Sequence, residues 1–329
     1  MLKYVLKRLG YILVTLWVIV TCTFFMMKNL PGTPFDAERF SIMTPQQQER
    51  VLEMYGLNDS LPMQYVKYIK NMLKGDLGTS FTYVNQDVSK VITGRLGPSA
   101  LIGIQAVLIG LAIGLILGIL AAWKHNSGID YFTMILAVLG VSVPNFVAAA
   151  LLQYYIGLKW GVLPVGFWTG WNCSVLPSIA LSFSATAMVA RFMRTEMLDV
   201  LDQDYIITAR AKGLSQMKVL MRHAVRNSIL PVVTILGPIV VNLMTGSLAV
   251  ENIFSIPGIG SLFVDCIKAN DYPVIMGITI FYAAFYMLIV LLVDLAYSLI
   301  DPRIRLAKGK ESSLWTNQKL TAACIRKRK

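Results

Sequence analysis

The sequence predicts an all-α, polytopic membrane protein with six transmembrane helices. Its 329 residues are 56% hydrophobic and only 15% charged, and the mean hydropathy is +0.61, which is outside the range of soluble domains. A helix needs roughly 20 mainly apolar residues to cross about 30 Å of hydrocarbon. Six segments meet this requirement: residues 9–27, 99–122, 131–157, 175–193, 229–250 and 276–299.

The distribution of basic residues indicates the orientation. Three Lys and Arg precede residue 9, one is Lys124, seven lie between 191 and 227, and nine follow residue 300, so 20 of the 30 fall on one side of the predicted spans. The positive-inside rule assigns that side to the cytoplasm. Both termini are therefore expected to be cytoplasmic.

The N-terminal segment with the first helix, residues 1–27, has a basic start and an apolar run that is long enough to span. No small-residue cleavage site follows the run, so we interpret it as a retained signal-anchor helix.

Residues 28–98 form the expected extracytoplasmic segment, and their composition predicts two amphipathic helices. Thr44, Pro45 and Gln47 are typical of a capped helix start, and Gly56 would end that helix. A second helix is predicted over residues 61–74, with Gly75 after it. These helices could lie on the outer membrane surface or form a packed cap that does not contact substrate.

Glycines and a proline mark the second and third spans. Gly110, Gly114 and Gly118 recur every four residues on one helical face, which predicts a tightly packed helix pair. Pro144 lacks an N–H and should kink the third span.

Two amides lie within the apolar segments. Asn145 follows the proline, and Asn242 lies in the fifth span. Polar side chains at this depth are expected to face a bundle interior or a watery path. They either line a translocation path or form hydrogen bonds between helices.

Motifs for catalysis or cofactor binding are missing from the sequence. It has no GxxxxGK[ST] loop and no HExxH pair, and its two histidines, His125 and His223, fall in predicted cytoplasmic loops. The four cysteines lie far apart, without metal-ligand spacing. We therefore expect no catalytic residue, metal site or cofactor in this chain, and an intramembrane enzyme is disfavoured.

The cytoplasmic loop at residues 200–228 is strongly basic. Asp204 is expected to cap a short helix through residue 212, Gly213 to end it in the left-handed conformation, and Ser215 to cap a second helix running toward Asn227. Pro231 would then start the fifth span.

The second helix of this loop is predicted to be amphipathic. Lys218, Arg222 and Arg226 form a basic stripe at i, i+4 and i+8, and the expected apolar side consists of Met217, Leu220, Met221 and Ala224.

Three interpretations fit this helical pair. It could bind anionic lipid headgroups, dock in DNA, or dock on a cytoplasmic protein partner. Two adjacent spans would keep it out of a major groove, so no nucleic acid partner is expected.

The segment DYIITARAKGLSQMKVLMRHAVRNSILPVV resembles the cytoplasmic loop of the inner-membrane permease subunits of ABC importers, in the oligopeptide, dipeptide and nickel branch. The general family pattern has a glutamate and two alanines where this chain has Ile207, Thr208 and Ala209. The stretch from Gly213 to Pro231 is also longer in this chain than in the general pattern. Both departures are typical of the peptide branch.

Other segments extend the resemblance to residues 1–306, including a five-helix core over 99–306. They are similar to the first (B-type) permease of the branch, and the basic cytoplasmic tail, 307–329, lies outside the resemblance. These segments are NLPGTPFDAE, LPMQYVKYIKNMLKGDLGTSF, VENIFSIPGIGSLFVDCIKANDYPVIMG and DLAYSLIDPRIR.

The resemblance implies the type I ABC importer permease fold in a bacterial plasma membrane, importing oligopeptides or dipeptides by alternating access. The implied partners are a second permease subunit, an extracytoplasmic substrate-binding protein, and two cytoplasmic ATPase subunits that bind ATP and Mg. The first short helix of the loop would sit in a groove of an ATPase. The coupling residues so implied are Asp204, Tyr205, Thr208, Ala209, Arg210, Ala211, Lys212, Gly213 and Leu214.

Two alternatives are a stand-alone channel or passive facilitator, and an ABC permease for nickel or another small solute. A further hypothesis places the loop at 251–275 against the extracytoplasmic segment, as part of the outer mouth.

Overall fold

The structure is a computed structural model that describes residues 2–29, 40, 42–54, 56–83, 86–244 and 248–300. Most of these residues are helical, and one isolated β-bridge joins Thr79 to Asp87. The tail at 307–329, with Cys324, lies outside the described residues.

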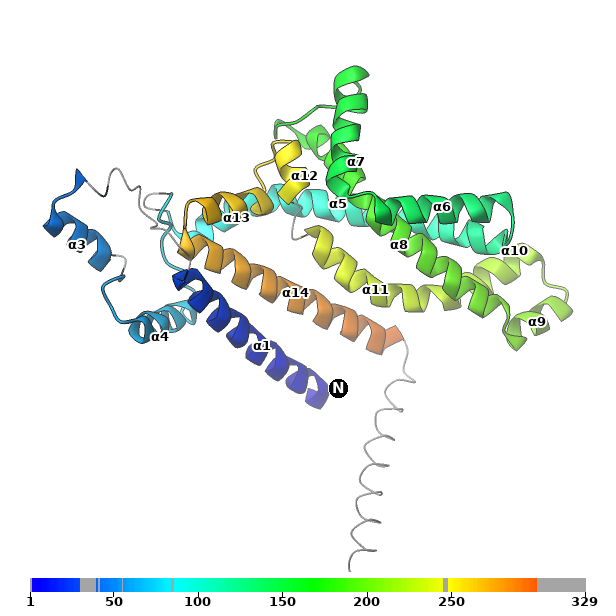
Figure 1. Cartoon of the computed structure of the whole chain (residues 1–329). Helices are drawn as coiled ribbons and strands as arrows, with labels where there is room; N and C mark the ends of the chain where they lie inside the picture. The colour runs from blue at the N-terminus through cyan, green and yellow to red at the C-terminus, as the bar shows by residue number, and fades with distance from the viewer. Residues whose placement is uncertain are drawn as a thin grey trace, which may run out of the picture.

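The two ends of the described chain pack together. Helix α1 (Leu2–Lys28) lies beside α14 (Tyr272–Ile300), although the two are more than 240 residues apart in sequence (Figure 1). Both are longer than predicted.

The segment after α1 contains the two expected helices, α3 (Pro45–Met54) and α4 (Leu61–Met72). The backbone N–H of Thr44 donates to Gln47 Oε1 (2.9 Å), and the N–H of Gln47 donates to Thr44 Oγ1 (3.4 Å). The predicted capping box is thus confirmed. Gly56 and Gly75 both adopt positive φ.

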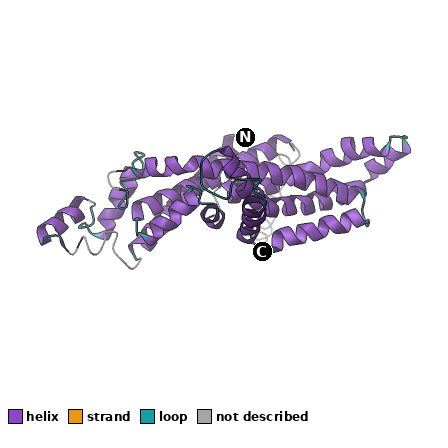
Figure 2. Cartoon of the chain, turned by 90° about the horizontal axis from the view of Figure 1, so that it is seen from above, coloured by secondary structure: helices purple, strands orange, loops and turns teal. Residues whose placement is uncertain are grey.

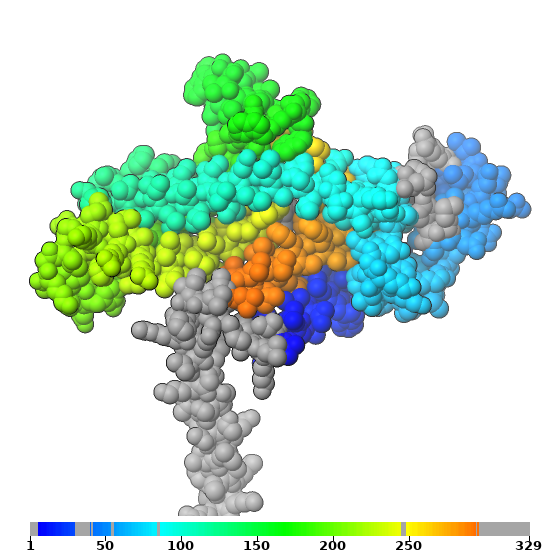
Figure 3. Space-filling view, turned by 180° about the vertical axis from the view of Figure 1, so that it is seen from behind, coloured from blue at the N-terminus to red at the C-terminus, as the bar shows by residue number. Residues whose placement is uncertain are grey.

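The core is built on α5 (Val88–Trp123) and α8 (Val175–Leu201), which pack along each other for most of their length. Figure 3 shows α5 extending along the rear face of the molecule. Buried residues from both helices, including Ile102, Ala106, Leu181 and Val189, form the main hydrophobic cluster.

The third predicted span is not one helix. Residues 131–157 divide into α6 (Gly128–Ser142) and α7 (Asn145–Leu152), which continues in a π-helical segment, Gln153–Lys159. The two parts are bent by 101°. The kink expected at Pro144 is therefore a break, and α7 stands away from the bundle (Figure 1).

Five helices are long and apolar enough to cross a membrane, and the bent pair makes a sixth if it is one span. Viewed from above, the molecule is elongated (Figure 2).

The basic loop contains α9 (Asp204–Ala211), followed by α10 (Gln216–Lys218), a π-helical segment (Val219–Val225) and α11 (Arg226–Met244). Gln203, not Asp204, is the N-cap of α9, and Asp204 lies in the first turn.

The second helix of the loop runs directly into α11, so the expected separation between loop and fifth span is wrong. No glycine or proline interrupts residues 216–230. Pro231 and Pro238 lie inside α11, as membrane helices tolerate.

Two short helices, α12 (Leu248–Ile253) and α13 (Ile259–Lys268), connect α11 to α14. Helix α13 lies toward the α3 and α4 end of the molecule and α12 lies beside the base of α7, whereas α9 and α10 lie at the opposite end (Figure 1).

Candidate functional site

Helix α9 has an anchored face and an outward face. Ile206 and Ala209 are buried against Val219 of the same chain. Leu214 packs at the edge of this cluster. Ala209 is only 5% exposed within this chain, so a partner would meet the other face of α9, and a coupling role for this residue stays a prediction. The exposed coupling residues are Asp204, Tyr205, Thr208, Arg210, Ala211, Lys212 and Gly213.

The turn after α9 has a defined geometry. Gly213 adopts φ +78°, and a Cβ built there would meet nothing within 4 Å. Position 213 therefore requires glycine because of its positive φ, and not because a side chain would lack space. The N–H of Gly213 donates to the carbonyl of Arg210 (2.9 Å), and Asn227 Nδ2 donates to Tyr205 Oη (3.0 Å).

The basic stripe predicted on the following helix is exposed at all three positions, Lys218, Arg222 and Arg226. Only two of the four residues predicted on the apolar side of this helix are buried. Leu220 and Ala224 are buried, but Met217 and Met221 are 52% and 53% exposed.

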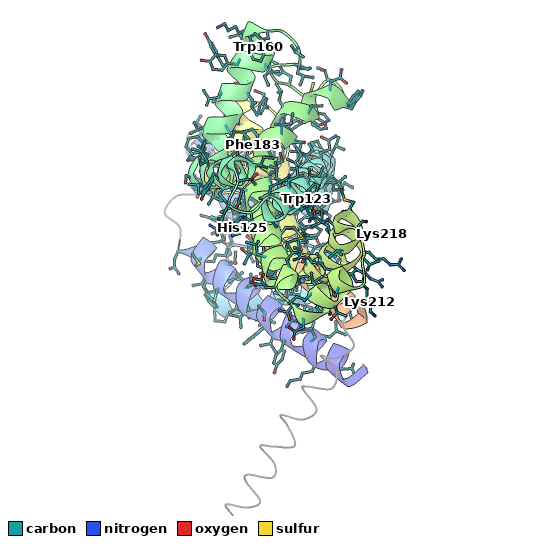
Figure 4. All side chains as sticks on the ribbon, turned by 90° about the vertical axis from the view of Figure 1, so that its right-hand side faces the viewer. Trp123, His125, Trp160, Phe183, Lys212 and Lys218 are labelled. Carbon is teal, nitrogen blue, oxygen red and sulfur yellow. The ribbon has the colours of Figure 1, made fainter. Side chains whose placement is uncertain are left out.

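A π-helical turn explains this difference. Its i, i+5 hydrogen bonding widens the helix, so Val219 and Ala224 share the buried face. Figure 4 shows Lys212 and Lys218 on the same side of the molecule, away from Trp160 on the projecting arm. The α9–α10 end therefore presents both basic and apolar side chains.

A buried ion pair that is not predicted from the sequence joins the neighbouring helices. The Asp130 carboxylate, 2% exposed, accepts hydrogen bonds from Arg194 Nε (2.6 Å) and Nη2 (2.8 Å) and from the N–H of Asn126 (3.0 Å). His125 Nδ1 lies 3.1 Å from the same carboxylate. These contacts tie the α5–α6 turn to the last turns of α8. The only signal in the sequence was an arginine close to the end of an apolar segment.

The three glycines of α5 face α8. A Cβ at Gly110 would lie 2.8 Å from Ala185 Cβ, one at Gly114 2.7 Å from Val189 Cβ, and one at Gly118 2.6 Å from the carbonyl oxygen of Ala190. Real Cβ atoms do not approach so closely, so the two backbones pack at a distance that excludes side chains.

Asn145 and Asn242 line the same pocket, of about 310 Å³. They reach it from α7 and α11, and α8 supplies Ser184 and Met188. The full lining is Val141, Val143, Pro144, Asn145, Ser184, Ala185, Met188, Ile239, Asn242 and Leu243.

A second buried carboxylate, missed by sequence reasoning, joins α5 to the loop before α14. Glu251 Oε1 accepts from Ser99 Oγ (2.7 Å), and Oε2 accepts from the N–H of Ser261 (2.9 Å). Ser99 Oγ in turn accepts from the N–H of Ile259 (2.9 Å). A Cβ at Gly258 would lie 2.3 Å from the Glu251 carboxyl carbon, so the carboxylate fits directly against the backbone of the SIPGIG turn.

The loop at 251–275 packs against the segment at 77–92, as expected. Asp271, which is fully buried, accepts from Ser80 Oγ (2.5 Å) and from the N–H of Thr82 (3.1 Å). Ile259 and Leu262 pack on Val88 and Ile92. Burial also raises the pKa of the Cys266 thiol to about 12, which makes it a packing residue and not a reactive one.

Two family models match the chain. That of the binding-protein-dependent transport system inner membrane component matches residues 114–306, and its N-terminal counterpart matches residues 1–98. The chain belongs to this family. This membership and its apolar helices make it a multi-pass protein of the bacterial inner membrane.

Curated relatives cover nearly the whole permease. The dipeptide transport system permease protein DppB of Lactococcus lactis is 46% identical over 93% of this chain and 100% of the relative. DppB of Bacillus subtilis is 43% identical over 94% of this chain and 99% of the relative. The oligopeptide transport system permease protein OppB of Salmonella typhimurium is 39% identical over 93% and 100%.

A chain of the MetNI methionine ABC transporter, solved in inward facing conformations, is similar in fold. The TM-score is 0.51 at 14% identity, covering 64% of this chain and 96% of that chain. The expected importer permease fold is confirmed by this likeness and by the family models.

Proposed function

We propose that this permease is one membrane subunit of an ATP-driven importer of short peptides. The observation that carries the proposal is the near full-length similarity to dipeptide and oligopeptide permeases. A permease for nickel or another solute, or a stand-alone channel, has no comparable support.

The proposed assembly contains a second permease subunit, two cytoplasmic ATPase subunits and an extracytoplasmic substrate-binding protein. ATP and Mg bind in the ATPase subunits. Both termini and residues 200–228 face the cytoplasm, and residues 28–98 face outward. The basic residues of the loop favour this orientation.

Coupling starts at the outward face of α9. Tyr205 and Ile207, 42% and 58% exposed, supply apolar contact, and Arg210 and Lys212 supply charge for acidic groups on an ATPase. The anchored face, Ile206 and Ala209, transmits displacement to Val219 and so to the helix that continues into α11.

The far end of that helix carries Asn242, which lines the pocket shared with Asn145. A shift of α11 relative to α7 would change the width of this pocket. We assign the two amides to the peptide path because they line one pocket and because a primary amide is chemically matched to the peptide backbone.

The coupling role is tested by Gly213→Val in the complete transporter. A β-branched residue cannot easily adopt φ +78°, so the α9 turn should change while the spans still insert. We expect ATP-dependent uptake of a labelled dipeptide in proteoliposomes to fall by at least about tenfold, with ATP hydrolysis retained.

Gly161→Val is the matched control, because Gly161 also has positive φ (+62°) and open space around its Cβ position. Equal uptake by Gly213→Val and wild type would contradict the coupling role.

A further inference from the structure

A second pocket lies at the end of the permease opposite α9. Its volume is about 350 Å³, at the small end of the range for ligand sites. The end of α1, residues 53–57, the middle and end of α4, the segment at 76–81 and the start of α14 all contribute to it. Its polar lining residues are Lys28, Glu53, Gln64, Lys67, Tyr68, Asn71, Asp76, Thr79 and Tyr272, and Phe24 and Phe81 are among its apolar ones.

The walls of this pocket are held in place by specific contacts. Thr21 Oγ1 and Tyr65 Oη lie 2.7 Å apart and join α1 to α4, and the rings of Phe24 and Tyr65 pack edge to face at 5.3 Å. The buried Asp271 carboxylate joins the turn at 80–82 to the start of α14. The pocket is therefore largely preformed.

A cation lies between two aromatic rings in this pocket. Lys28 Nζ is 5.8 Å from the ring centroid of Phe24 and 5.9 Å from that of Tyr272. Among the described residues no carboxylate lies within ion-pair distance of it, whereas Lys67 is paired with Asp59 at 2.6 Å. Lys28 thus offers its charge to an anion.

A buried hydroxyl in the same pocket lacks a partner. Tyr68 Oη makes no hydrogen bond within the described part of the chain, although the atom is buried. Burial raises the pKa of Tyr68, so the hydroxyl stays protonated and can donate. An unpaired buried donor is costly, and an acceptor from a ligand would remove that cost.

We propose that this pocket binds a dipeptide in its zwitterionic form, with its carboxylate at Lys28 and Tyr68 and its ammonium at Glu53 and Asp76. Aromatic rings beside these groups suit an apolar side chain. The inference rests on the proposed function for its location, because the pocket is on the outer surface only if α9 is cytoplasmic. It adds a site at which the permease itself contacts substrate before the path between α7 and α11.

The test uses the complete transporter in lipid nanodiscs without the binding protein. The probe is the photoreactive dipeptide alanyl-benzoylphenylalanine, with cross-links mapped by mass spectrometry. We expect labelling in α4, residues 76–81 or the start of α14. Alanyl-phenylalanine should compete with the probe, and its C-terminal amide and N-acetyl derivatives should compete at least about tenfold less well.

Two variants and one control connect the labelling to the pocket. Tyr68→Phe removes only the unpaired hydroxyl and should weaken labelling about threefold to tenfold without lowering the Tm. Lys28→Met should weaken it by about tenfold or more. Lys70→Met removes a charge from the exposed side of α4, the helix that carries Tyr68. Labelling of this variant should match that of wild type. Equal competition by acid and amide, or unchanged labelling in both variants, would overturn the inference.

ATP-dependent uptake by the wild-type transporter is measured separately, with the binding protein present. Absence of that uptake contradicts the proposed function, whereas the labelling pattern decides the dipeptide site on its own.

Discussion

Glu251 is the clearest example of a residue whose role depends on the whole fold. Its side chain is 2% exposed, and a carboxylate is buried at acceptable cost only when its oxygens accept hydrogen bonds. Ser99 and Ser261 provide these bonds from two distant parts of the chain. The carboxylate therefore fixes the turn at 256–261 on the first part of α5.

Glu251→Gln should lower the stability of the permease. The substituted amide can keep one acceptor oxygen but places an NH₂ group against donors, so we expect a loss of roughly 1.5–3 kcal/mol. Thermal unfolding of the purified complex measures it. Glu49→Gln, on the exposed side of α3, is the control, and equal Tm values for the two variants would show that the buried hydrogen bonds contribute little.

Residues with local roles could be predicted from the sequence. The capping box at Thr44 and Gln47 and the left-handed Gly213 both depend on neighbours within a few positions. Asp130 could not be assigned, because its partner Arg194 is 64 residues away. Glu251 and Ser99 are 152 residues apart, so spacing alone carries no signal for their contact.

At the scale of elements, the α5–α8 pair depends on glycine at one face of α5. The backbone of α8 occupies the space where side chains on that face would extend. In a bilayer this close packing contributes the dispersion contacts that hold helices together.

Gly118→Ala should separate α5 from α8. The added methyl group would meet the Ala190 carbonyl oxygen at 2.6 Å, and overpacking of this kind typically costs about 1–3 kcal/mol. The Tm of the purified complex reports it. Gly94→Ala, on the same helix with nothing within 4 Å, should leave the Tm unchanged or raise it. A Gly118→Ala complex as stable as Gly94→Ala would mean that the helices tolerate a wider spacing.

Two features of the elements were predicted incompletely. A kinked but continuous helix is predicted at Pro144, but Val143 and Pro144 are both extended, with ψ 119° and 138°. The residue before a proline disfavours the helical conformation, and a β-branched valine adds to that preference, so α6 ends there. The π-helical turn at 219–225 had no recognisable signal, and it moved Met217 and Met221 to the surface.

At the scale of the whole molecule, the two regions with assigned roles lie at opposite ends. The dipeptide pocket lies beside α4, and the coupling face lies on α9 (Figure 1). Composition and motifs were enough to predict the family and the helical bundle. The pocket beside α4 was not predicted, because five short segments from both ends of the chain build it.

The orientation can be tested by cysteine labelling in a background without native cysteines. Lys70→Cys on α4 and Lys212→Cys after α9 both replace exposed side chains. A membrane-impermeant maleimide should label Lys70→Cys in intact spheroplasts, and Lys212→Cys only after permeabilisation, because basic loops remain inside. The reverse pattern would invert the topology and remove the proposed coupling role of α9.

The uninterrupted helical run from Gln216 to Met244 has a mechanical consequence. At 1.5 Å of rise per residue, about 40 Å of helix separates the start of α10 from Asn242. A tilt of about 5° at one end of a helix of that length would displace the other end by about 3.5 Å, slightly more than the width of one water molecule. In the proposed assembly, small rotations of an ATPase subunit beneath α9 would thus be enough to open or close a passage for solutes at the other end.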